Sequence, residues 1–209
     1  MKLTLYLLAI ALSSYLLGSI NGAIITSKYI YKKDVRQFGS GNPGLTNFYR
    51  VFGVKGTALV LVIDILKSVI PAIFGGWLLG KLGMRTLGAE AAAFFVMVGH
   101  SFPAYYKFRG GKTVLAAGAA LFVIDLRVAI ASWVVFLCVM LLTRFVSLGS
   151  MAAGVAYPVS AAIFGLGPWC FLIAALSAAL LLFRHKANIQ RLVNGTESRI
   201  SFSRRGGEK

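Results

Sequence analysis

Seven apolar segments, separated by short polar connections, make up most of this 209-residue chain. A helix needs roughly 20 mostly apolar residues to cross the hydrocarbon core of a bilayer. Hydrophobic residues make up 58% of the chain and charged residues only 13%, and a soluble domain of this size could not bury so much apolar surface. The sequence therefore predicts an all-α integral membrane protein with seven transmembrane helices, at about residues 3–25, 56–79, 87–98, 113–124, 128–143, 151–166 and 169–183.

No internal repeat and no separate soluble domain interrupts this pattern, so we expect residues 1–209 to form a single membrane domain. The helical bundle would occupy about residues 1–184, and residues 185–209 would form a basic tail with a loose end. The fourth segment is short, and we expect the turn before it to fold into the membrane, where an irregular backbone is tolerated only beside a polar cavity.

Basic residues predict the orientation. When alternate connections are taken together, one side holds seventeen Lys and Arg residues and the other holds four, with Lys67 inside a span. Loops rich in Lys and Arg stay in the cytoplasm. The N-terminus is therefore expected outside and the C-terminus inside. The net charge of +16 indicates topology and lipid headgroups, because most of the basic residues lie between apolar segments, and it does not indicate nucleic acid.

The first polar connection contains the sequence GSGNPGLTNFYR, residues 39–50, which has the composition of an anion cradle. Its glycines permit sharp turns and a close approach of backbone N–H groups to a ligand. Asn42 followed by Pro43 predicts a helix N-cap and first helical residue, which would aim free N–H groups into the loop. The alternative is a surface turn rich in Gly and Asn. The candidate ligand-binding residues here are Gly39, Ser40, Gly41, Asn42, Gly44, Thr46, Asn47 and Arg50.

Three further polar segments are predicted at the same face. Gly110, Gly111 and Lys112 form a turn before the fourth segment, which could hold a phosphate or a developing oxyanion. His185, Asn188 and Arg191 recur every three residues and would share one face of a helix, although a basic helix lying on the membrane is the alternative. The other two candidates are Ser147, in the connection before the sixth segment, and His100, which could instead be a satisfied buried histidine.

Acidic residues are few. The six carboxylates are scattered, so neither a paired acid and base nor a metal cage is predicted. Asp64 and Lys67 lie three residues apart inside the second segment, where they could pair with each other or serve a function. The site is thus rich in phosphate binders and poor in strong bases, which favours a substrate that arrives already activated.

Three strings carry a resemblance: GSGNPGLTNFYR, GHSFPAYYKFRGGKTVL and HKANIQRLVNGTE. In this order on a seven-span frame, they resemble the signature regions of the bacterial membrane acyltransferase family that moves a fatty acyl group from acyl phosphate to glycerol 3-phosphate. The resemblance implies synthesis of 1-acyl-glycerol 3-phosphate, or lysophosphatidic acid, by acylation of the sn-1 hydroxyl in phospholipid biosynthesis. It also implies a bacterial cytoplasmic membrane location, no cofactor or metal, and no direct use of acyl-CoA or acyl carrier protein.

The resemblance also implies residue roles. Residues 40–47 would bind the donor phosphate, Arg50 and Lys112 would hold phosphates of both substrates, and His185 and Asn188 would contact glycerol 3-phosphate. The acyl chain would lie in a groove between spans. Leu45, Ser68 and Thr113 depart from the family pattern, without removing a charge or a phosphate-binding donor.

The proton of the glycerol hydroxyl would pass to a phosphate oxygen with His185 orienting the substrate, or to His185 itself as a general base. Two other functions remain open at this stage. A transporter of anionic phosphorylated solutes would also use cationic loops and broken helices, and a noncatalytic scaffold could bind anionic lipid.

Overall fold

A computed structural model describes residues 1–200 of the chain, and within these residues the regular structure is entirely helical. All seven predicted apolar segments are present as helices. The α-helices are α1 (Lys2–Gly18), α2 (Gly22–Tyr29), α3 (Leu45–Phe52), α4 (Val54–Gly80), α5 (Arg85–Ser101), α6 (Val114–Ile124), α7 (Leu126–Thr143), α8 (Val146–Ile163), α9 (Pro168–Arg184) and α10 (Lys186–Val193), and short 3-10 helices cover Val35–Gln37 and Ala104–Tyr106. The final residues of the predicted loose tail, 201–209, lie outside the described part of the chain.

Five helical stretches are long and apolar enough to cross a membrane, and the number rises to six if α9 and α10, bent by 57°, count as one. The prediction of an all-α integral membrane architecture is thus supported by the helices themselves. The exception among the seven segments is α6, whose 11 residues extend only about 16 Å at 1.5 Å per residue, about half of a hydrocarbon core. The Gly-Gly-Lys turn before it therefore lies recessed from the end of the bundle.

Two helix boundaries differ from the prediction. The first segment breaks after Gly18 and restarts at Gly22, because the side chain of Asn21 caps α2 by accepting the N–H of Ile24 at 2.9 Å. α8 begins at Val146 and not near residue 151, so Ser147 lies in its first turn and not in a connecting loop. A second serine in the first turns of α8, Ser150, donates its hydroxyl hydrogen to the backbone carbonyl of Val146 at 2.8 Å, so its polar group is satisfied within the helix.

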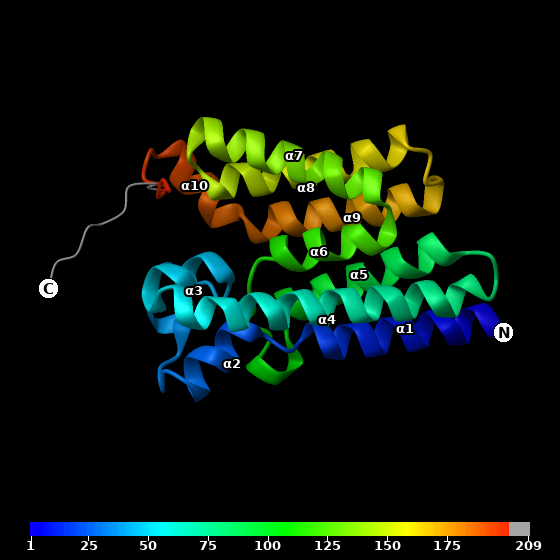
Figure 1. Ribbon diagram of the computed structural model, residues 1–209, viewed down its shortest axis with the longest axis horizontal. Helices are drawn as coiled ribbons and strands as arrows, with labels where there is room; N and C mark the ends of the chain where they lie inside the picture. Colours follow the sequence, from blue (N-terminus) through cyan, green and yellow to red (C-terminus); the bar gives the residue numbers. More distant parts are fainter. Residues whose placement is uncertain (201–209) are drawn as a thin grey trace, which may run out of the picture.

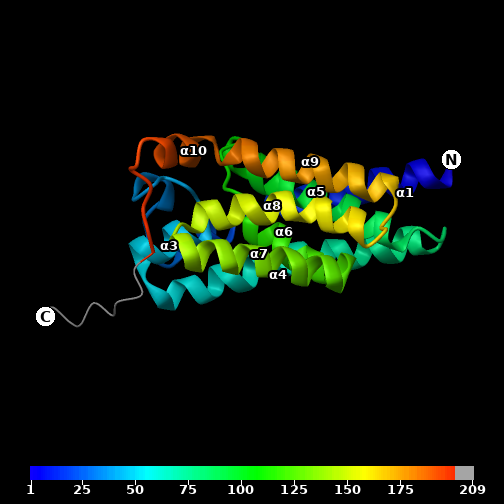
Figure 2. The ribbon, with the colours of Figure 1, turned by 90° about the horizontal axis from the view of Figure 1, so that it is seen from above.

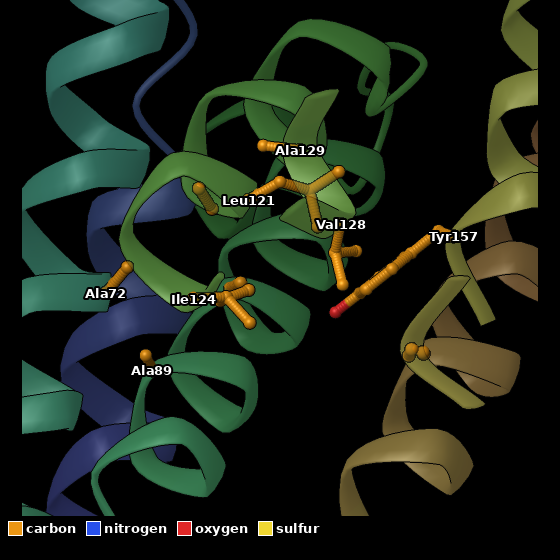
Figure 3. Close-up of a cluster of buried hydrophobic side chains, with 11 residues drawn as sticks. Ala72, Ala89, Leu121, Ile124, Val128, Ala129 and Tyr157 are labelled. Carbon is orange, nitrogen blue, oxygen red and sulfur yellow. The ribbon is translucent and has the colours of Figure 1, made fainter. Parts of the chain in front are cut away.

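α6 lies between a group formed by α1, α4 and α5 and a group formed by α7, α8 and α9 (Figure 1). Small residues allow these helices to approach closely, as is usual in membrane bundles. Around the end of α6 and the start of α7, the side chains of Ala72, Ala89, Ile124 and Val128 pack in one buried cluster, toward which Tyr157 of α8 extends (Figure 3).

The polar connections gather at one end of the bundle. α2, α3 and α10 lie at this end, and the N-terminus lies at the other (Figures 1 and 2). The residues that join α5 to α6 and α7 to α8 lie at the same end, as the alternation of apolar segments predicts. Segments far apart in the sequence can therefore contribute to one site.

Candidate active site

A cavity of about 340 Å³ opens at this end of the bundle, within the size range of small-molecule sites. Its mouth includes Ser40, Thr46 and Arg50, which are exposed. Its inner wall includes His100 and His185, each with only 2% of its surface accessible. The cavity thus leads from a polar opening to a buried polar end.

The cradle loop is shaped by its own residues before it meets any ligand. Gly39 and Gly41 adopt positive φ values of 59° and 70°, which favour glycine. The Asn47 side chain holds the loop closed, since its Oδ1 accepts the N–H of Ser40 at 2.9 Å and its Nδ2 donates to the Phe38 carbonyl at 3.0 Å. The side chain of Asn47 is therefore already engaged in shaping the loop, although Asn47 also lines the cavity.

The predicted N-cap at Asn42 is wrong, because α3 begins only at Leu45 and its N-cap is Gly44. Pro43 lies before the helix, and its carbonyl accepts a hydrogen bond from the side chain of Asn21 at 3.1 Å. Gly44 has no side chain to cap the helix. The N–H groups of residues 45–47 consequently have no acceptor within residues 1–200, and they begin a helix that borders the cavity.

The side chain of Arg184 stabilises the Gly-Gly-Lys turn by hydrogen bonds. Its Nη2 donates to the Gly110 carbonyl at 2.7 Å and its Nε donates to the Gly111 carbonyl at 3.1 Å. The N–H of Gly111 donates to the carbonyl of His100 at 3.0 Å, so it is not free for a ligand. Gly110 and Gly111 are absent from the cavity lining, and the turn acts by placing the side chain of Lys112 in it.

Lys112 begins a chain of polar contacts that crosses the cavity. Its ammonium donates to Oδ1 of Asn188, and Nδ2 of Asn188 donates to Oε1 of Glu197 at 2.7 Å. The same oxygen accepts the hydroxyl of Ser147 at 2.7 Å, and Oε2 accepts Nε of Arg191 at 2.7 Å. One carboxylate therefore orders three of the residues that the sequence predicted to bind substrate.

The electrostatics of the site favour an anionic ligand. The pKa of Lys112 is lowered to about 8, mainly by burial and also by the nearby guanidinium groups of Arg191, Arg50 and Arg184, while Glu197 opposes the shift. Burial alone would raise the pKa of Glu197, but its hydrogen bonds outweigh burial and leave the pKa below its usual value. A bound phosphate would relieve the repulsion around Lys112.

His185, the first residue after α9, is held in one tautomer. Its Nδ1 lies 2.8 Å from the Leu181 carbonyl, which can only accept, so Nδ1 carries the hydrogen. Burial lowers the pKa of His185 to about 4, so the ring is neutral at physiological pH. The lone pair of Nε2 therefore remains available to accept a hydrogen bond or a proton.

A small apolar cavity adjoins the polar one. The two share Val114, Trp133, Phe136 and Ser150, and the apolar cavity continues between α6, α7, α8 and α9 to Leu121 and Tyr157. Trp133 lies at this junction, where its Nε1 donates to the Gly118 carbonyl at 3.1 Å. The site thus combines a region for charged groups with a neighbouring region suited to hydrocarbon.

Comparison with known proteins decides the family. The model of the glycerol-3-phosphate acyltransferase family matches residues 8–195. The glycerol-3-phosphate acyltransferase of Thermoanaerobacter pseudethanolicus is 37% identical over 196 residues, covering 94% of this chain and 96% of that protein. The enzyme of the same name from Listeria monocytogenes is 35% identical over 201 residues, covering 96% of this chain and 100% of that protein.

The chain belongs to the glycerol-3-phosphate acyltransferase family. Its fold also matches the crystal structure of PlsY (YgiH), an integral membrane glycerol 3-phosphate acyltransferase, in two forms. The glycerol 3-phosphate form has a TM-score of 0.84 at 33% identity, covering 93% of this chain and 96% of that chain. The lysophosphatidic acid form has a TM-score of 0.82 at 32% identity, covering 93% and 95%. The resemblance drawn from the three strings is confirmed, and an acyltransferase is supported over a transporter or a scaffold.

For an acyltransferase of this family, the structure brings most of the predicted site residues together. The cavity is lined by Ser40, Asn42, Gly44, Thr46, Asn47, Arg50, His100, Lys112, Ser147, His185, Asn188 and Arg191. Gly39, Gly41, Gly110 and Gly111 do not line it and shape the loops that do.

Two site residues were missed by sequence reasoning. Glu197 was part of the third string, but one isolated carboxylate in a basic tail gives no local sign of its partners. Arg184 was counted only among the basic residues that predict the orientation, yet it donates hydrogen bonds to both carbonyls of the Gly-Gly turn. Its position just before His185, at the end of an apolar segment, was the available signal.

Proposed function

We propose that this chain transfers a fatty acyl group from acyl phosphate to the sn-1 hydroxyl of glycerol 3-phosphate, giving lysophosphatidic acid and inorganic phosphate. The observation that carries the proposal is the single cavity in which Arg50, Lys112 and neutral His185 meet beside an apolar cavity. Two phosphorylated substrates need cationic groups, and a fatty acyl chain needs hydrocarbon surroundings. Both requirements are met within one connected region.

The donor phosphate is assigned to the cradle and the start of α3. Ser40 and the N–H groups of residues 45–47 would donate hydrogen bonds to it, and the forked guanidinium of Arg50 would neutralise part of its charge. The acyl chain would extend past Trp133 into the apolar cavity between α6 and α8. This placement puts the reactive carbonyl near the boundary between the two cavities.

Glycerol 3-phosphate is assigned to the opposite wall, against α10 and the first turn of α8. Its phosphate would contact Lys112 and Arg191, and its hydroxyls would contact His185, Asn188 and Ser147. Asn188 is well suited to this role because Lys112 and Glu197 fix the two ends of its amide. A preorganised donor costs little ordering free energy when the substrate binds.

The chemistry is acyl transfer between two oxygens. The sn-1 oxygen attacks the acyl carbonyl carbon, the bond from that carbon to the phosphate oxygen breaks, and the electron pair leaves with phosphate. Phosphate is a good leaving group, so positioning and neutralisation of charge can supply most of the acceleration. The hydroxyl proton passes to a phosphate oxygen, with His185 orienting the substrate. General base catalysis by His185 is the second route, and its low pKa makes it the weaker one.

The membrane arrangement follows from the same assignment. We infer one membrane domain in which the seven apolar helices all contribute spans, with α6 reaching only part of the way. The end that carries the cavity and most of the basic residues would face the cytoplasm of a bacterial inner membrane, with the N-terminus outside. Soluble glycerol 3-phosphate would enter from the cytoplasm, and the acyl chain would enter from the lipid.

Purified protein tests the proposal directly. Acyl phosphate and glycerol 3-phosphate should yield lysophosphatidic acid and phosphate in equal amounts, and acyl-CoA in place of acyl phosphate should yield none. Product from acyl-CoA alone would contradict the assigned donor. Uptake of glycerol 3-phosphate by protein-containing vesicles, with no lysophosphatidic acid formed, would instead support a transporter.

A further inference from the structure

Lys67 is a charged residue of α4 that is 95% buried among α1, α4 and α5. Its ammonium contacts three acceptors, each at 2.7 Å: Oδ1 of Asp64, the carbonyl oxygen of Ile20 and Nδ1 of His100. An ammonium carries three hydrogens and no lone pair, so it can only donate. The ring nitrogen Nδ1 of His100 must therefore accept, and the ring hydrogen must be on Nε2.

Asp64 keeps Lys67 in its charged form. The two residues form an ion pair one helical turn apart, as the sequence allowed, and Asp64 also accepts the N–H of Gly22 at 3.2 Å. A buried ion pair with its remaining hydrogen bonds satisfied is far less costly than a lone buried charge. Mutual pairing accounts for only one of the three Lys67 contacts, and the contact to His100 needs its own explanation.

The other ring nitrogen of His100 lacks a hydrogen-bond partner within the described residues. The backbone of Lys112 comes near this ring, but not in hydrogen-bonding geometry with Nε2. Gly111 packs directly against it, since a Cβ on Gly111 would lie 2.5 Å from Nε2. His100 is 98% buried and lines the cavity. Buried donors are almost always paired in folded proteins, so an unpaired one at a cavity wall points to a ligand.

We propose that Lys67 is a positioning residue that fixes His100 as the Nε2–H tautomer, and that His100 donates this hydrogen to a phosphate oxygen of a substrate. The donor is neutral and its direction is set by a buried ion pair. It therefore binds an oxygen without adding charge next to Lys112. The identity of the substrate rests on the proposed function, whereas the tautomer rests only on the three contacts of Lys67.

The chain contains only two histidines, and the structure assigns them opposite tautomers. His185 carries its hydrogen on Nδ1, because that nitrogen faces the Leu181 carbonyl, and His100 carries its hydrogen on Nε2. Nitrogen-15 NMR of the full-length protein, labelled at histidine and held in lipid nanodiscs, distinguishes protonated from unprotonated ring nitrogens. We expect one ring of each type at pH 7.5, with His185→Gln assigning the spectrum. Two rings protonated at Nδ1 would overturn the proposal.

Ligand additions then identify which substrate supplies the oxygen. Glycerol 3-phosphate alone and a non-transferable acyl phosphonate alone are added in separate samples. The Nε2–H resonance of His100 should shift with one of them, and inorganic phosphate should produce the same direction of shift at higher concentration. A resonance unmoved by all three would overturn the contact while leaving the tautomer in place. Failure to form lysophosphatidic acid would instead remove only the proposed function.

Two substitutions separate the contact from a structural role. In His100→Gln, the side-chain amide nitrogen takes the place of Nε2 and keeps a donor in the cavity. In His100→Asn, the amide oxygen takes the place of Nδ1 and keeps the contact to Lys67, but the donor is lost. We expect His100→Asn to lower kcat/KM about 100-fold and His100→Gln to lower it by less than 10-fold. The reverse order would show that His100 serves only to satisfy Lys67.

Lys67→Met removes the ammonium that fixes the ring. In this variant His100 should no longer occupy one tautomer, and its nitrogen-15 resonances should move toward averaged positions. An unchanged Nε2–H tautomer in folded Lys67→Met protein would overturn the role of Lys67. If this variant does not fold, the spectrum of the wild-type protein and the two His100 variants still decide the proposal.

Discussion

Binding of a phosphorylated substrate should weaken as the pH rises through 8, because Lys112 loses its proton there in the empty site. The pKa of Lys112 lies at about 8, against an ordinary value of 10.5. At ~1.4 kcal/mol per pH unit, this difference corresponds to about 3.5 kcal/mol against the charged form, an upper limit for a partly exposed side chain. A bound phosphate offsets this cost and raises the pKa of Lys112.

The sign of the effect follows from which form binds. The protonated form binds phosphate better, so affinity is complete below pH 8 and falls above it, by up to about tenfold per pH unit, until the pKa of the complex is reached. A complete return of the pKa to 10.5 would limit the total loss to about 300-fold. Binding at pH 8.5 should also take up about three quarters of a proton per site, because a Lys112 side chain with a pKa of about 8 is already about one quarter protonated there.

The assay is KM for glycerol 3-phosphate between pH 6.5 and 9.5 at saturating acyl phosphate, together with calorimetry in two buffers of different ionisation enthalpy. The matched control is Lys112→Arg, whose guanidinium stays charged and should give a flat profile at a higher KM. The ring of His185, with a pKa of about 4, titrates far below this range. A wild-type KM that is constant to pH 9.5, or that rises equally in Lys112→Arg, would refute the reasoning.

Three further substitutions and one control substitution test the site. Arg50→Ala should lower kcat/KM by about 10²- to 10³-fold without loss of folding, whereas Lys81→Ala, at the opposite end of the bundle beside Trp77, should retain activity; equal effects would contradict the site. Glu197→Gln should raise KM more than it lowers kcat. The carboxylate of Glu197 raises the pKa of Lys112, so its removal should lower that pKa and move the pH profile to lower pH. Gly111→Ala should lower the free energy of unfolding by about 1–3 kcal/mol and reduce activity, measured by thermal denaturation and kcat/KM, since its Cβ would lie 2.7 Å from the Pro43 carbonyl.

The membrane fold could be predicted because its signal is local. Each apolar segment can be recognised by its length and composition, and each of the seven is helical in the structure. Alternation of segments then places every second connection at the same end, which is why four distant polar stretches could be expected to meet. The prediction that the Gly-Gly-Lys turn folds into the membrane rests on the shortness of the segment after it, and α6 has only 11 residues.

Helix starts in the cradle could not be predicted because contacts from elsewhere decide them. Asn42 followed by Pro43 has the local form of a helix start, but Asn21 engages the Pro43 carbonyl from 22 residues away. The Asn47 side chain likewise closes its own loop by hydrogen bonds to Ser40 and Phe38. In both cases the folded chain supplies a hydrogen-bond partner that the local sequence does not reveal.

Asp64 and Lys67, the two charged residues in the second span, also show how far local sequence can predict contacts. Spacing alone predicts that Asp64 and Lys67 can pair, and they do. Spacing cannot show that the helix break at Ser19–Asn21 offers the Ile20 carbonyl, or that His100 of α5 completes the set of acceptors. Ser68, a departure from the family pattern, fits this environment by donating its hydroxyl to the Asp64 carbonyl at 2.9 Å.

The carboxylate of Glu197 would be expected to repel an anionic ligand, but its charge is balanced by an ion pair. Glu197 neutralises Arg191 at 2.7 Å, and Asp64 neutralises Lys67. Among the lining residues that the structure describes, Arg50 and Lys112 are then the two cations without an ion-pair partner. They lie on different elements, one on α3 and one at the start of α6, and the proposed reaction has two phosphorylated substrates. Glu197 therefore leaves one uncompensated cation for each substrate, while its hydrogen bonds hold Asn188 in position to meet the acceptor.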